Sequence, residues 1–185
     1  MKRLAVLITA AALAFPAPAL PAGAALPVPP QQMFEAMQLY IEQGDFDKAG
    51  RILEKMVPLL DELKTAYGTD LYGETRLALK KNDAWEAQSA VLKVVYFHMK
   101  SELSRAIVQS GRSAAVAVRV AYLDYLFLAP RVSRKNSGLA GEAERRFKAV
   151  YELVSSGRAG PEREKETWAH VREIERICLL ALETG

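Results

Sequence analysis

The fold is decided by Ser-Ala-Ala-Val-Ala-Val-Arg-Val-Ala-Tyr-Leu-Asp-Tyr-Leu-Phe-Leu-Ala, residues 113–129. As a helix this run is apolar on almost every side, and only Arg119 and Asp124 interrupt it. A helix without a wide polar face is normally buried among other helices or lies in a membrane. A membrane span needs about 20 apolar residues with few or no charges, and this run is shorter and carries two. We therefore expect it to be the central helix of a soluble helical domain.

Amphipathic segments on both sides of this run predict the helices that cover it. Their apolar residues recur three or four positions apart, as on one face of a helix, and no alternating strand pattern of useful length appears. The predicted fold class is therefore all-α, a single-domain bundle of six or seven antiparallel helices over residues 31–185. The other predicted helices are residues 31–43, 45–67, 71–81, 83–110 and 142–156, and a last helix that starts at Pro161.

Two prolines set predicted boundaries. Pro58 falls inside the apolar pattern of residues 45–67, so it predicts a kink or a split at Val57. Pro130 predicts the end of the central helix. The polar residues 131–141 that follow it predict a loop.

The first 24 residues predict a signal peptide. A short basic start precedes an apolar run over residues 4–15, and Ala-Gly-Ala at residues 22–24 offers a small-residue cleavage site. Residues 25–30, Ala-Leu-Pro-Val-Pro-Pro, then predict an extended, proline-rich lead-in. We expect a mature chain that is periplasmic or secreted and has no membrane span after cleavage of the signal.

The charge balance argues against a nucleic-acid partner. Without Lys2 and Arg3 of the predicted signal peptide, the chain has 23 basic and 22 acidic residues, a net charge of +1. Nucleic-acid binders normally concentrate basic residues on one face. Cys178 is the only cysteine, so no disulfide can form within the chain. A buried thiol is the simplest interpretation, and a disulfide-linked dimer is the alternative.

One polar cluster is predicted inside the hairpin of the helices on either side of Gly111. The turn is very short, so these helices should be antiparallel neighbours. His98 precedes Gly111 by thirteen residues and Asp124 follows it by thirteen. Glu102 and Arg119 lie nine before and eight after it. The spacing predicts His98 next to Asp124 and Glu102 next to Arg119, although Arg119 and Asp124 cannot both point straight at the same neighbouring helix.

Two interpretations of this cluster stay open. Buried ion pairs that fix the register of the helices are the first. The second is a small-ligand or divalent-metal site, because imidazole and carboxylate are suitable metal ligands. Met99, Tyr122 and Tyr125 would lie near such a site. A catalytic role is not expected, because the sequence places no evident nucleophile beside the histidine.

A second, weaker candidate lies on the last predicted helix. Glu166 precedes His170 by four residues and Glu173 follows it by three, so the three side chains share one face. Ordinary surface pairing with nearby arginines and lysines explains the same spacing. The chain has no Cys-x-x-Cys-His, no Cys/His zinc set and no phosphate-binding loop. No cofactor is therefore expected, apart from the alternative of a divalent metal.

Together these patterns predict an exported helical binding or adaptor protein without catalytic activity. Its partner would be another periplasmic or membrane protein, and nucleic acid is not expected. The alternative is a periplasmic metal- or cofactor-binding protein that uses His98 and Asp124.

Overall fold

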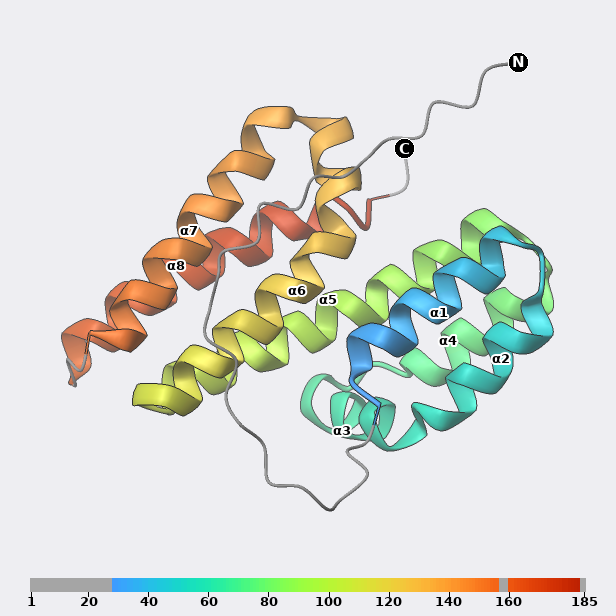
Figure 1. Cartoon of the computed structure of the whole chain (residues 1–185), viewed down its shortest axis with the longest axis horizontal. Coiled ribbons are helices and arrows are strands. Elements are labelled where there is room, and N and C mark those ends of the chain that lie inside the picture. The colour runs from blue at the N-terminus through green and yellow to red at the C-terminus, as the bar shows by residue number, and fades with distance from the viewer. Residues whose placement is uncertain (1–27, 157–159, 184–185) are drawn as a thin grey trace.

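The computed structural model describes residues 28–156 and 160–183, and within these ranges the chain is all-helical. This confirms the predicted all-α class (Figure 1). The predicted signal peptide lies outside the described residues. The helices are α1 (Pro30–Glu42), α2 (Phe46–Lys55), α3 (Val57–Tyr67), α4 (Leu71–Lys80), α5 (Ala84–Val108), α6 (Gly111–Lys135), α7 (Ser137–Ser155) and α8 (Pro161–Leu179).

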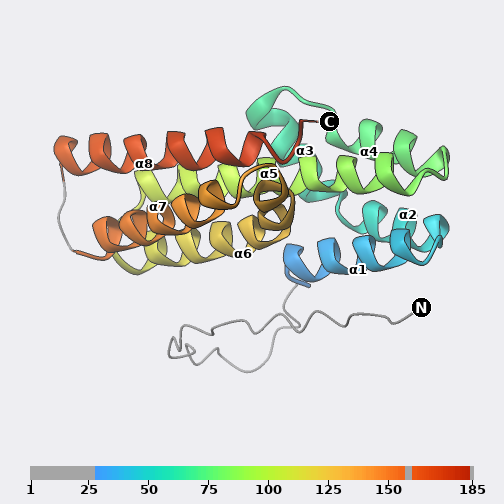
Figure 2. The same ribbon diagram turned by 90° about the horizontal axis from the view of Figure 1, so that it is seen from above.

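The central helix is α5, and the prediction that residues 113–129 are enclosed on most sides is wrong. Helix α5 packs against α1, α3, α4, α6 and α8, and Figure 2 shows it running between α8 on one side and α6 on the other. Helix α6 packs mainly against α5 and α7 and leaves Val116, Leu123 and Leu126 44–48% exposed. Because α6 is apolar on nearly all sides, its sequence does not reveal which face is covered.

The predicted break at Pro58 is confirmed. Helix α2 ends at Lys55 and α3 begins at Val57, so Pro58 falls in the first turn of α3, where no intrahelical donor is required. The start of α2 also follows from local chemistry. The side chain of Asp45 accepts a 3.0 Å hydrogen bond from the backbone N–H of Lys48 and caps the helix.

The predicted helix end at Pro130 and the predicted loop over residues 131–141 are both wrong. Helix α6 continues to Lys135, and α7 begins at Ser137. Pro130 is exposed, whereas Leu128 and Val132 on either side of it are buried in the core. The core contacts hold both parts of the helix in place, and α6 changes direction in its last third (Figure 1), as expected for a helix that contains proline.

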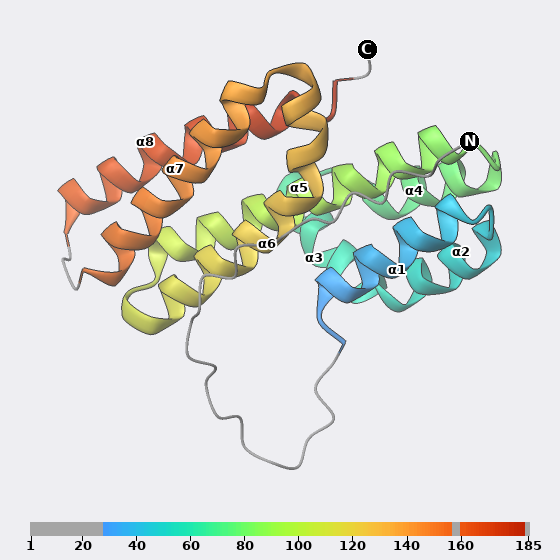
Figure 3. The same cartoon turned by 45° about the horizontal axis from the view of Figure 1, so that its top comes forward.

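Helices α5 and α6 form one long antiparallel hairpin, which lies beside the α7–α8 pair (Figure 3). By length and composition α6 also meets the requirements of a membrane-spanning helix, the only one among the described residues to do so. Its inner face carries a set of buried core residues. These are Ala114, Ala117, Val118, Ala121, Tyr125, Leu128 and Val132.

Candidate functional site

The predicted contact between His98 and Asp124 is confirmed. Nδ1 of His98 lies 2.7 Å from Oδ2 of Asp124, and the two residues are 5% and 0% exposed. The short turn at Gly111 brings α5 and α6 together as antiparallel neighbours, and Gly111 there has a φ of +60°, which glycine adopts without strain. The pair therefore lies on the inner seam of the hairpin, as equal spacing from the turn predicts.

Gln31 completes the pair, and the sequence analysis did not identify it. Its Nε2 donates a 2.8 Å hydrogen bond to Oδ1 of Asp124 from the first turn of α1. The ring of Phe34, one turn later, meets His98 edge-on with the centroids 5.7 Å apart. Gln31 and Asp124 are 93 residues apart in the chain, so no local spacing pattern signals this contact.

Burial and hydrogen bonding act in opposite directions on Asp124. Its removal from water is the larger effect and raises the pKa of the carboxyl above the ordinary value of 3.8. The hydrogen bonds from His98 and Gln31 act to lower that pKa, because they stabilise the ionised form. Each carboxyl oxygen of Asp124 is thus in contact with a protein side chain, Oδ1 with Gln31 and Oδ2 with His98.

The second predicted pair, Glu102 with Arg119, does not form. Oε1 of Glu102 accepts from Nη1 of Arg105 at 2.6 Å, one turn along the same helix. Nη2 of Arg119 donates to the hydroxyl of Tyr151 on α7 at 2.8 Å, and its guanidinium lies over the same ring. The physical reason is the angular separation of Arg119 and Asp124 around α6: only Asp124 faces the inner seam with α5.

Tyr122, Tyr125 and Met99 lie close in sequence but do not join the cluster. Tyr125 donates a 2.9 Å hydrogen bond to the backbone carbonyl of Ala140, and the rings of both tyrosines pack on Phe147 of α7. Met99 is turned toward α8, where its sulfur lies 3.8 Å from the Cys178 thiol. These three side chains therefore join α5 and α6 to their other neighbours.

The weaker candidate on α8 is also engaged in surface pairing. Nδ1 of His170 lies 3.2 Å from Nη1 of Arg146. Glu173 accepts from Arg176 at 2.6 Å, and this ion pair lowers the pKa of Glu173. Glu166 is exposed. The geometry supports the interpretation as helix-surface pairing.

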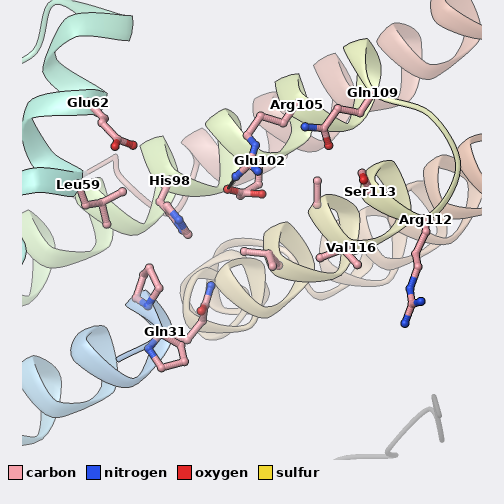
Figure 4. Close-up of a pocket in the computed structure, with 14 residues that line it drawn as sticks. Gln31, Leu59, Glu62, His98, Glu102, Arg105, Gln109, Arg112, Ser113 and Val116 are labelled. Atoms are coloured by element: carbon pink, nitrogen blue, oxygen red, sulfur yellow. Dashed lines mark hydrogen bonds and ion pairs between the residues drawn. The ribbon is translucent and has the colours of Figure 1, made fainter. Parts of the chain in front are cut away.

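An open groove of about 660 Å³ begins at His98 and follows the seam between α5 and α6 (Figure 4). The start of α1 and the middle of α3 border one end of it, and the α5–α6 turn borders the other. Its walls mix charged, polar and apolar side chains. The lining residues are Pro29, Pro30, Gln31, Leu59, Glu62, His98, Glu102, Arg105, Gln109, Arg112, Ser113, Val116, Ala117 and Val120.

The donor set does not fit a metal. Within residues 28–156 and 160–183, no three His, Cys, Asp or Glu side chains are close enough together to hold an ion. Asp124 lies behind His98, with both oxygens occupied by donors. Of the predicted ligand candidates, His98 and Glu102 line the groove and Asp124 does not.

Comparisons with known proteins reveal no relative of this chain: no family model, no curated protein and no solved structure matches it.

Proposed function

We propose that this chain is an exported, non-catalytic binding or adaptor protein with a bundle-like helical domain. Its ligand or partner occupies the groove between α3, α5 and α6. One observation carries the proposal: His98 and Glu102 are only 5% and 7% exposed, yet both line an open groove. Each side chain is engaged within the protein through one atom, Nδ1 of His98 by Asp124 and Oε1 of Glu102 by Arg105. A ligand in the groove can pair with the polar atom of each that remains.

The export part of the proposal is supported by residues 1–24, whose basic start, apolar run and small-residue site have the order of a secretory signal. Expression of the full chain in a bacterial host tests it. We expect the protein in the fraction released by osmotic shock, and N-terminal sequencing should start at Ala25. A chain that stays in the cytoplasm with its first residues intact would contradict export.

A hydrolytic role is not favoured, because a histidine–carboxylate pair needs a nucleophile within hydrogen-bond reach. Ser113 is the serine that lines the groove. It lies eleven residues from Asp124 on the same helix, which is about 16 Å along the axis. His98 therefore cannot activate that hydroxyl.

The metal-binding alternative is also less well supported. A metal held by His98 would need two further ligands close by, and Glu102 is already paired with Arg105. Dialysis against Zn²⁺ or Mn²⁺ followed by metal analysis tests this alternative. Stoichiometric metal that is lost in His98→Ala, with the fold intact, would favour it over the binding protein.

The groove is tested by filling it. Val116 lines the groove and is 47% exposed, so Val116→Trp should fold and reduce the space available to a ligand. Leu77→Trp is the matched control, because Leu77 is 59% exposed on α4 and does not line the groove. In a thermal-shift screen of small metabolites and short peptides, hits should stabilise the wild type and the control but not Val116→Trp. Hits that stabilise Val116→Trp equally would place binding elsewhere.

A further inference from the structure

One end of the groove offers hydrogen-bond acceptors to a ligand, and it is built around Asp124. Gln31 donates to Asp124 through its amide nitrogen, and Nδ1 of His98 contacts the other carboxyl oxygen. Oε1 of Gln31 remains as an acceptor and the second N–H of the same amide as a donor, and Nε2 is the ring nitrogen of His98 that remains available to a ligand. Both residues line the groove. No described residue supplies a hydrogen-bond partner to Nε2 of the nearly buried His98.

Two carboxylates lie beside these acceptors. Glu102 follows His98 by one helical turn, and Arg105 engages only its Oε1. Glu62 faces the same space from α3, and Figure 4 shows it on the His98 side of the groove. Arg105 also lines the groove and pairs with Glu102 through one oxygen. A group that carries several donors and a positive charge complements the acceptors that remain and the charge of Glu62. A primary ammonium, with three N–H donors on one atom, has that chemistry.

The opposite end of the groove has the reverse character. Arg112, Gln109 and Ser113 line it next to the first turn of α6. No side chain caps the backbone N–H groups of that turn, since Ser110 makes no capping hydrogen bond. The arginine and the positive end of the helix dipole both favour a carboxylate at this position.

The distance between the two ends limits the length of the ligand. His98 and Gln109 are eleven residues apart on α5, which corresponds to about 16 Å. An extended peptide advances at most about 3.3–3.6 Å per residue, so about five residues span the groove. Between the ends, Val116, Ala117 and Val120 form an apolar wall against which small aliphatic side chains pack.

We infer that the groove binds a short peptide of about five residues in extended form. Its N-terminal ammonium lies against His98 and Glu102, and its C-terminal carboxylate lies against Arg112 and the start of α6. This inference rests on the proposed binding function and names the ligand class. It differs from a metal site because the peptide is held along the whole groove, through its chain and its carboxylate as well as its ammonium, and needs no set of three ligands around one point.

Isothermal titration calorimetry at about pH 7, where the peptide N-terminus is still mostly an ammonium, tests the inference with the full mature chain and the pentapeptide Ala-Val-Ala-Val-Ala. Removing a charged hydrogen-bonding group costs about tenfold in affinity or more. N-acetylation should therefore weaken binding by about that factor, and so should amidation of the C-terminus. The tripeptide Ala-Val-Ala should bind more weakly than the pentapeptide, because it cannot reach both ends.

Variants of the protein test which groove residue contacts each end of the peptide. N-acetylation should lose most of its effect in Glu102→Gln, and amidation should lose most of its effect in Arg112→Ala. The control is Glu144→Gln, because Glu144 is exposed on α7 and does not line the groove. This variant should behave as the wild type. Absence of pentapeptide binding, or an acetylation cost that is equal in wild type and Glu102→Gln, overturns the inference. If a non-peptide ligand is excluded by Val116→Trp while peptides do not bind, the proposed function stands and this inference falls.

Discussion

Nδ1 of His98 and Oδ2 of Asp124 lie 2.7 Å apart across the α5–α6 hairpin, 26 residues apart in the chain. Three helices meet at this contact, because Gln31 of α1 donates to the other oxygen of Asp124. The pair therefore lies in the core beneath the start of α1, and His98 and Gln31 also line the groove. Stability and the proposed ligand binding consequently share these two side chains.

Replacing Asp124 by leucine should destabilise the protein by about 3 kcal/mol, the cost of removing one member of a buried pair. The change leaves the donors of His98 and Gln31 without their acceptor. Urea denaturation of wild type and variant measures the difference. Asp61→Leu, at an exposed position on α3, is the control and should cost little. An unchanged denaturation midpoint in Asp124→Leu would show that the pair is dispensable.

The raised pKa of Asp124 predicts a pH dependence of defined sign. The folded protein keeps this proton to a higher pH than the unfolded chain, whose carboxyl titrates near 3.8. The contribution of this group is therefore complete below that pH and is lost as pH rises through the folded pKa. As pH rises above 3.8, the free energy of unfolding of wild type relative to Asp124→Asn should fall. A relative stability that rises over this range would contradict the burial effect.

Truncation of Phe34 should be among the most damaging single changes in α1. The ring is 0% exposed and packs edge-on against His98 and Phe127, with centroids 5.7 and 6.1 Å away. Phe34→Ala should cost about 3–5 kcal/mol, measured by chemical denaturation. Leu39→Ala on the same helix is the matched control, because Leu39 is 50% exposed. Equal costs for the two variants would mean that α1 is not anchored through Phe34.

Pro130→Ala should stabilise the chain by about 1–2 kcal/mol. Proline removes one backbone donor from the interior of α6, and alanine restores it toward the carbonyl of Leu126. Because Pro130 is exposed, the smaller side chain leaves no cavity in the core. A lower thermal midpoint for Pro130→Ala would instead show that the bend of α6 is required for the packing of α7.

The Cys178 thiol should be inert in the folded protein. It is 0% exposed, and burial raises its pKa, so little reactive thiolate forms. Titration with Ellman's reagent should give no reaction until denaturant is added. A Cys178→Ser chain carrying Val108→Cys, a position 80% exposed, should react at once. Rapid reaction of the native thiol, or a disulfide-linked dimer on a non-reducing gel, would contradict the buried position.

Part of the candidate site was predictable because it depends on one local feature. The very short turn at Gly111 fixes the register of α5 and α6, so equal spacing from the turn places His98 beside Asp124. Arg119 shows the limit of this argument. Spacing from the turn predicts how far along α6 Arg119 lies, but not the side of the helix from which it projects. Its guanidinium points toward Tyr151 of α7. Spacing determines height, whereas contacts with other helices determine which side chain faces the seam.

The sequence predicted helix boundaries correctly where a single local signal decides them. Asp45 caps α2, and Pro58 separates α2 from α3, as local chemistry requires. Pro130 is the counterexample, because buried Leu128 and Val132 hold α6 together beyond it. Here a local penalty of a few kcal/mol was overridden by packing that only distant residues supply.

Periodicity, capping and turn length are local properties of the chain, and they were enough to predict the helical class, most helix boundaries and the contact between His98 and Asp124. The packing of distant helices sets three further features: α5 is the enclosed helix, Gln31 joins the pair, and a groove opens beside it. The reason is physical: α6 is apolar on nearly every side, so which of its faces is buried depends on where α1, α7 and α8 come to rest.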